Sequence, residues 1–180
     1  MNHQSRNITM GEDELDIFSS TLLFEVIDIA CKQIGIMEVP PGSNRGPTVS
    51  AYLRSVALVP GNPWCAAFVY WCFEHASVSL NRLNPLEKTG ACMLHWKNTR
   101  GTKILSFEAI KNPLLIEPGL VFIISLGNGK GHTGIVTGYR DGYITTIEVN
   151  ANAHHSAEGT GVVALVRKIE SINAGFIKYN

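Results

Sequence analysis

The sequence has few charged residues and no excess of either sign. Charged residues make up 17% of its 180 residues, and 15 basic residues balance 15 acidic ones, whereas about a quarter of an average soluble protein is charged. Proteins that bind nucleic acid mainly through phosphate contacts carry a basic excess. The hydrophobic content of 45% also excludes a solvated, disordered chain. We therefore expect a folded domain that binds no nucleic acid.

Long hydrophobic runs are missing as well. The longest strongly apolar stretches, 63–73 and 120–126, are far shorter than the about 20 residues of a membrane-spanning helix. The first residues are polar and acidic and lack the basic start, apolar run and cleavage site of a secretory signal. We expect no integral membrane association. We also expect a protein that is cytoplasmic until it is released or injected, unless a leader has been removed.

The cysteines form no recognisable framework. There are four, Cys31, Cys65, Cys72 and Cys92, and their spacing matches no paired Cys-x-x-Cys zinc pattern. If Cys65 and Cys72 share a helix, their α-carbons lie about 10.5 Å apart, which exceeds the limit of about 7 Å for a disulfide. Most of these thiols are therefore expected to be small core residues.

Hydrophobic periodicity divides the chain into two halves. Residues 1–12 are expected to be a flexible tail, and residues 13–180 a single domain. The first half has helical spacing of its apolar residues, over 15–34, 48–56, 65–76 and 91–98. The second half has strand-like runs, over 120–126, 133–139, 143–149, 162–167 and 175–178. Helices followed by an antiparallel meander of about five strands indicate the α+β class.

Cys65 is the first candidate for chemistry. It follows Pro63-Trp64 and begins a predicted buried helix. The positive end of a helix dipole lowers the pKa of a thiol and so favours the thiolate, which is the nucleophilic form. Cys72 lies two turns further along and has no such advantage, so we expect it to be structural.

A general base would have to lie near this thiol, and His132 is the best candidate. It begins a predicted strand after a glycine-rich loop, where its side chain is held yet accessible. Glu148 and Asn150 lie two residues apart on the next strand and therefore on one face of it. A carboxylate or amide there would orient the imidazole, as in a catalytic triad. Either residue fits this role.

The turn between these strands decides whether the side chains meet. A two-residue Asp141-Gly142 turn alone would place Thr133, not His132, opposite Asn150. A three-residue loop, 140–142, or an equivalent bulge further along, would place His132 opposite Asn150 and Gly134 opposite Glu148. We predict the three-residue loop or such a bulge. Gly134 would then leave room for the Glu148 side chain.

The segments 38–76 and 131–152 resemble the CHAP family of cysteine- and histidine-dependent amidohydrolases/peptidases. The resemblance rests on the Pro-Trp-Cys start of a helix, followed by a Gly-His strand and Glu-x-Asn. It implies a papain-like fold and a peptidoglycan hydrolase in which Cys65 is the nucleophile, His132 the base and Glu148 the residue that orients it. Asn150 would be an auxiliary polar group. The segment 149–152 departs from the glycine-rich motif usual in the family.

The resemblance also implies a substrate and a place of action. Cys65 would attack an amide of peptidoglycan, either the sugar–peptide amide or a peptide cross-link, in the cell wall or periplasm. The side chains expected to line the cleft are Glu38, Asn44, Arg45 and Trp64. Because the acidic calcium loop of some phage members is missing, we expect no metal and no cofactor. We expect a monomer, with an immunity or inhibitor protein as a possible partner.

Two other functional interpretations of the same residues remain open. One is a catalytically degenerate module that only binds wall peptides. The other is a zinc site built from Cys65, His132, His154 and His155, which group only loosely in the sequence.

Overall fold

The first half of the chain is helical, as its periodicity predicts. The computed structural model describes residues 12–149 and 160–179, with the side chains of 12–20 left out. The helices of this half are α1 (Glu12–Cys31), α2 (Pro47–Ser55), α3 (Cys65–Ser79) and α4 (Cys92–Asn98). Pro47 occupies the first turn of α2, where its missing N–H costs nothing. Residues 1–11 lie outside the described residues, so the extent of the expected tail stays a prediction.

The second half forms one antiparallel sheet of six strands. These are β1 (Thr102–Leu105), β2 (Val121–Gly127), β3 (Lys130–Arg140), β4 (Tyr143–Val149), β5 (Val162–Lys168) and β6 (Gly175–Lys178), in the order β1-β6-β2-β3-β4-β5. Strands β2 to β5 form four strands of the expected meander, whereas the fifth predicted strand, β6, returns to lie between β1 and β2. Strand β1 was not predicted, because three of its four residues are exposed and the sequence there has no hydrophobic run. Helix α5 (Ser106–Lys111) and two 3-10 turns, η1 (Pro113–Leu115) and η2 (Ile169–Ser171), were not predicted either.

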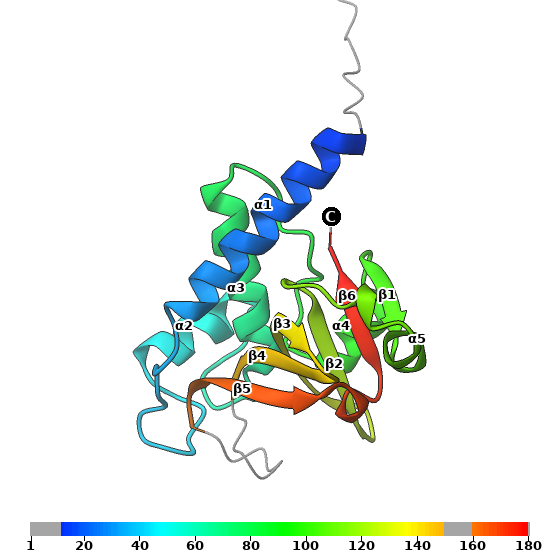
Figure 1. The fold of residues 1–180 in the computed structure, drawn as a ribbon. Coiled ribbons are helices and arrows are strands. Elements are labelled where there is room, and N and C mark those ends of the chain that lie inside the picture. Colours follow the sequence, from blue (N-terminus) through cyan, green and yellow to red (C-terminus); the bar gives the residue numbers. More distant parts are fainter. Residues whose placement is uncertain (1–11, 150–159, 180) are drawn as a thin grey trace, which may run out of the picture.

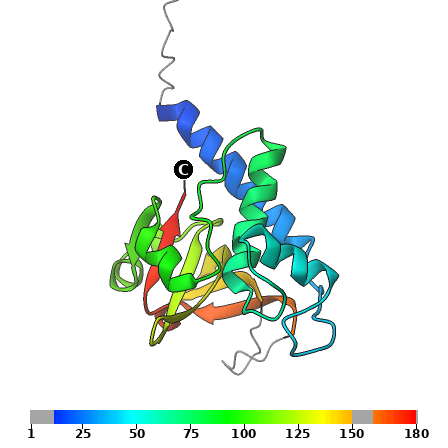
Figure 2. The same ribbon diagram turned by 180° about the vertical axis from the view of Figure 1, so that it is seen from behind.

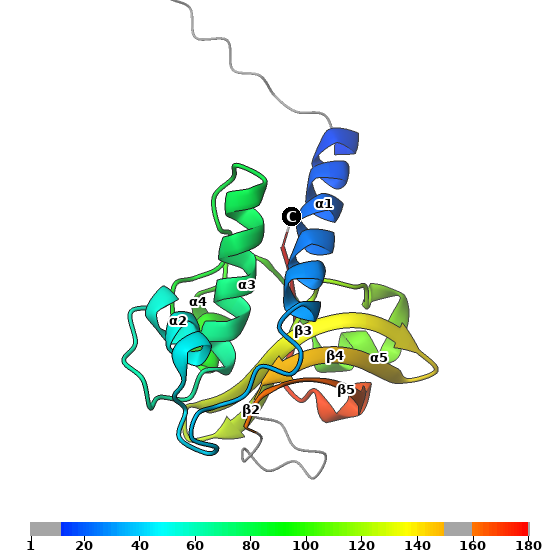
Figure 3. The ribbon, with the colours of Figure 1, turned by 90° about the vertical axis from the view of Figure 1, so that its left-hand side faces the viewer.

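The sheet has a hydrophobic core on each face. Helices α1 and α3 pack side by side and cover one face, and α2 packs against α3 (Figures 1 and 3). The other face packs its apolar side chains around Leu120, Phe122 and Phe176, with α5 beside β1 and β6 (Figures 1 and 2). Alternate residues of β2 serve the two cores, since Val121 belongs to the first and Phe122 to the second. None of the described helices is both long enough and apolar enough to cross a membrane.

The β3–β4 hairpin reaches the predicted register in a different way from the predicted loop. Arg140 pairs with Tyr143, so the turn has two residues, Asp141 and Gly142, and not three. Both have positive φ, 51° and 83°, as in a type I′ turn. The register then shifts by one residue between Val136 and Gly138, and Gly134 pairs with Glu148. The prediction of a three-residue loop was wrong, but the alternative of a bulge further along is what the structure has.

Candidate active site

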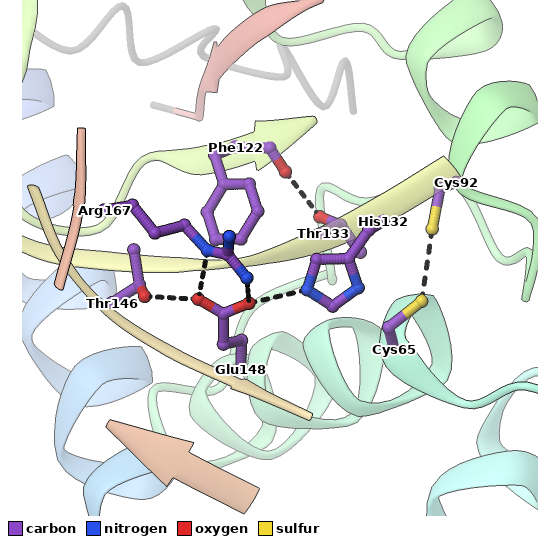
Figure 4. Close-up of polar contacts among 8 residues, drawn as sticks. All are labelled: Cys65, Cys92, Phe122, His132, Thr133, Thr146, Glu148 and Arg167. Carbon is purple, nitrogen blue, oxygen red and sulfur yellow. Dashed lines mark hydrogen bonds and ion pairs between the residues drawn. The ribbon is translucent and has the colours of Figure 1, made fainter. Parts of the chain in front are cut away.

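The nucleophile candidate occupies the first position of the central helix. Cys65 begins α3 directly after Trp64, and ten of the fifteen residues of this helix are buried. The Cys65 side chain itself is 8% exposed. Its sulfur faces the imidazole of His132, which projects from β3 (Figure 4). The helix thus holds the thiol rigidly at the junction of helix and sheet.

His132 is held from its other side by Glu148. Its Nε2 atom lies 2.6 Å from Oε2 of Glu148, so the remaining ring nitrogen faces Cys65 (Figure 4). Glu148 is fully buried. The pairing of Gly134 with Glu148 makes this approach possible, because a Cβ on Gly134 would lie only 2.7 Å from the Cβ of Glu148. The predicted trio of Cys65, His132 and Glu148 therefore meets at one place.

Two further side chains, which the sequence did not point to, hold the carboxylate of Glu148. Arg167 of β5 donates from Nε to Oε1 at 2.7 Å and from a terminal nitrogen to Oε2 at 2.6 Å. Thr146 donates to Oε1 at 2.6 Å. The Arg167 guanidinium also lies 5.8 Å from the ring of Phe122, which is beside His132 (Figure 4). Every oxygen of the orienting carboxylate is thus occupied, which leaves it one orientation.

A second thiol lies against the nucleophile. Cys92, the first residue of α4, places its sulfur 3.4 Å from the sulfur of Cys65 (Figure 4). Both cysteines are free thiols. The sequence predicts most of the cysteines to be core residues, and a separation of 27 positions in the chain gives no signal that Cys65 and Cys92 touch.

The charges of the site favour a thiolate–imidazolium pair. The pKa of Cys65 is held well below its usual value, chiefly by the hydrogen bond with Cys92, and burial opposes this effect. The hydrogen bond and charge of His132, and the backbone N–H of Ala66, lower the pKa of Cys65 further. Burial alone would lower the pKa of His132, but its contacts with Cys65 and Glu148 outweigh burial and raise it to about 9. Between the lowered pKa of Cys65 and the raised pKa of His132, the nucleophile is ionised and the histidine carries a proton.

Glu148 completes the charge arrangement as a fixed anion. Burial would raise its pKa, but the hydrogen bonds and charges of His132 and Arg167 outweigh burial and lower it to about 2. The carboxylate is therefore ionised throughout the neutral range. A buried carboxylate between two cations can orient the imidazole and stabilise its protonated form.

The four predicted substrate-binding residues differ in how far they are buried. Trp64 is fully buried, and its indole N–H donates to Oε1 of Glu38 at 2.8 Å. Glu38 is buried too and accepts the backbone N–H of Asn44 at 2.9 Å. Trp64 and Glu38 therefore brace the loop from inside and do not line a cleft. Arg45 is exposed and Asn44 is half-buried, so a substrate contact by these two stays a prediction.

Three of the predicted positions cannot be placed, so the zinc interpretation that uses His154 and His155 stays untested. Asn150, His154 and His155 lie outside the described residues, so the auxiliary role of Asn150 stays a prediction. Within 12–149 and 160–179, no three His, Cys, Asp or Glu side chains gather as metal ligands would. Cys72 is fully buried in the core, and burial raises its pKa well above the usual value. A neutral, enclosed thiol of this kind is structural.

Comparison with known proteins gives one family and one solved structure. The family model of the CHAP domain matches residues 58–150, just over half of the chain. The fold is similar to the crystal structure of a wild-type endolysin, LysIME-EF1, with a TM-score of 0.56 and 16% sequence identity. The similar region covers 88% of this chain and 65% of that endolysin chain. Among the curated proteins none matches this sequence.

Proposed function

Because the chain belongs to the CHAP domain family, we propose that it is a peptidoglycan hydrolase that cleaves an amide bond through a cysteine thioester. The observation that carries the proposal is the position of His132. Its imidazole lies between the thiol of Cys65 and the carboxylate of Glu148 (Figure 4). Acyl transfer by a cysteine requires a nucleophile, a base in contact with it and a group that orients the base.

The first half-reaction forms the acyl-enzyme. The Cys65 thiolate attacks the amide carbonyl carbon, and the carbonyl oxygen becomes an oxyanion. The backbone N–H of Cys65, at the start of α3, is the natural donor to this oxyanion, because the first N–H groups of a helix have no partner within it. Protonated His132 then gives its proton to the leaving amine, and the C–N bond breaks.

The second half-reaction releases the product. Neutral His132 takes a proton from water, which attacks the thioester and frees Cys65. Glu148 keeps its negative charge in both steps, since its pKa of about 2 lies far below neutral pH. Its part is to hold Nε2 of His132 and to stabilise the imidazolium.

The substrate follows from the family and not from the site alone. We propose the peptide part of peptidoglycan, cut at the sugar–peptide amide or at a cross-link, in the cell wall or periplasm. Exposed Arg45 and neighbouring Asn44 are the predicted substrate contacts. If they bind the wall peptide, Arg45→Ala should raise KM while kcat changes little. The protein would act as a monomer, and an immunity protein would have to cover Cys65.

Purified peptidoglycan tests the proposal directly. Wild-type protein should release muropeptides whose masses identify the bond that is cut, and Cys65→Ala should release none. Cys72→Ala is the matched control, because it removes a buried thiol of the same helix and should keep hydrolysis. Full activity of Cys65→Ala would refute the mechanism. Wall binding by wild-type protein without any release of muropeptides would identify a binding module instead.

A further inference from the structure

The contact between Cys65 and Cys92 has no part in the reaction described so far. Their sulfurs lie 3.4 Å apart, and the two side chains are 8% and 5% exposed. In such a position a second thiol either fills space or acts on the nucleophile. The surroundings of Cys92 distinguish these possibilities.

A glycine on β3 makes room for Cys92 beside Cys65. Gly131, the residue before His132, carries no side chain, and a Cβ there would lie 3.0 Å from the Cβ of Cys92. Helix α4 can therefore approach β3 closely enough for Cys92 to reach the sulfur that also faces His132. The same short segment of β3 thus sets the position of both neighbours of the nucleophile.

The two thiols differ in their charge state. The pKa of Cys92 is raised well above its usual value, first by the hydrogen bond with Cys65 and then by burial. The pKa of Cys65 is shifted in the opposite direction. At neutral pH Cys92 therefore keeps its proton, and a protonated S–H next to a thiolate can only be the donor. A hydrogen bond to a buried anion is stronger than one between neutral groups.

We propose that Cys92 is a catalytic residue whose S–H donates a hydrogen bond to the thiolate of Cys65 and keeps the nucleophile ionised. This inference rests on the proposed function. It adds a third donor to the thiolate, beside the imidazolium of His132 and the backbone N–H of Ala66. When the thioester forms, the negative charge leaves the sulfur, and Cys92 is released from this role until the next cycle.

The test is the rate at which iodoacetamide alkylates Cys65, measured against pH and followed on the Cys65 peptide by mass spectrometry. At acidic pH, where Cys65 is mostly protonated, Cys92→Ala should react about tenfold more slowly, because a hydrogen bond to a charged group is worth about that factor. Cys92→Ser keeps a donor and should react close to the wild-type rate. At alkaline pH, where every variant is ionised, Cys92→Ala should react at least as fast as wild type, because a thiolate with a higher pKa is the better nucleophile.

This reversal with pH separates donation from packing. A variant that only loosened the fold would change the rate in one direction at every pH. Cys72→Ala is the control for loss of a buried thiol and should follow the wild-type curve. Equal low-pH rates for Cys92→Ala and wild type, or a folded Cys92→Ser as slow as Cys92→Ala, would overturn the inference. Because alkylation needs no hydrolysis, that failure is distinct from a failure of the proposed function, which active Cys65→Ala would reveal.

Discussion

Arg167 holds both carboxylate oxygens of Glu148, at 2.7 and 2.6 Å, from the neighbouring strand. The pair is enclosed, since the side chain of Arg167 is 9% exposed and that of Glu148 is fully buried. Breaking a buried ion pair at one end leaves an uncompensated charge inside the protein. The orientation of His132 therefore depends on Arg167, which acts on it through Glu148.

Replacement of Arg167 should weaken both stability and catalysis. Arg167→Gln should lower the free energy of unfolding by about 3 kcal/mol or more. It should also raise the pKa of Glu148, and it should lower kcat strongly while KM changes little. Arg167→Lys keeps the charge but loses the two-pronged contact, so it should fall between wild type and Arg167→Gln.

Urea denaturation and steady-state kinetics would measure these effects. Arg140→Gln is the control, because Arg140 pairs with Asp141 on the surface of the same sheet, and both side chains are largely exposed. Its effect should stay within about 0.5 kcal/mol. A fully active, fully stable Arg167→Gln variant would show that Glu148 needs no cation.

Hydrolysis should follow a bell-shaped pH profile with a wide plateau. On the acid side, activity is lost when the Cys65 thiolate takes up a proton, which the lowered pKa of Cys65 delays to low pH. On the alkaline side, it is lost as His132 gives up its proton near pH 9. Glu148→Gln removes an anion that raises the pKa of His132, so the alkaline limb should move to lower pH. An unchanged alkaline limb in that variant would contradict the assignment of Glu148.

The same groups predict how stability depends on pH. The folded pKa of Glu148 is lowered from 4.5 to about 2, so its contribution is present above pH 4.5 and is lost as the pH falls towards 2. The folded pKa of His132 is raised from 6.5 to about 9, so its contribution is present below pH 6.5 and is lost as the pH rises through 9. Denaturation of wild type and Glu148→Gln across this range measures the acid part.

A side chain at Gly134 should disrupt the site from within the sheet. The added Cβ of Gly134→Ala would lie 2.7 Å from the Cβ of Glu148 and 2.8 Å from the ring of Phe122. Relief of such contacts costs about 1–3 kcal/mol, and it would push Glu148 away from His132. Gly138→Ala, on the same strand, meets only the hydroxyl of Thr145 at 3.0 Å and is the matched control. Thermal unfolding and hydrolysis should both separate the two variants.

Oxidation by a hydroperoxide should join the two sulfurs of the site. Peroxide transfers an oxygen to the Cys65 thiolate and leaves a sulfenic acid; the Cys92 thiol then attacks that sulfur, and water departs as the disulfide forms. Activity should fall, a Cys65–Cys92 linked peptide should appear, and dithiothreitol should reverse both changes. In Cys92→Ser no bridge can form, so a second peroxide oxidises the Cys65 sulfenic acid to a sulfinic acid, and prolonged treatment should give inactivation that resists reductant. Cys31→Ser should behave as wild type, and permanent inactivation of wild type would contradict the expected bridge.

Much of this site was accessible from the sequence, because its central residues lie next to strong local signals. Pro63-Trp64 marks the start of the Cys65 helix, and Asp141-Gly142 marks the turn that pairs β3 with β4. The position of the extra residue, opposite Thr145 and Thr146 in the middle of β4 and not in the turn, was not accessible. A one-residue bulge depends on the packing of both strands and leaves no turn signal.

Arg167 and Cys92 were missed for a different reason. Each reaches the site through contacts between elements that are distant in the sequence. Arg167 acts across the β4–β5 pairing, whose register no turn signal specified. Cys92 acts through the docking of α4 on Gly131. Trp64 and Glu38 show the reverse case: the sequence suggested polar and aromatic cleft residues, whereas their mutual hydrogen bond lets both be buried.

The position of Arg167 sets a limit on how far the protein can be trimmed. The family model ends at residue 150, before β5 and β6. An excised piece with that boundary would contain Cys65, His132 and Glu148 but no guanidinium for the carboxylate. It would also leave β4 and β2 without the partners they have on one side in the intact sheet. We therefore expect a shortened version to keep the geometry of the site only if it extends through residue 178.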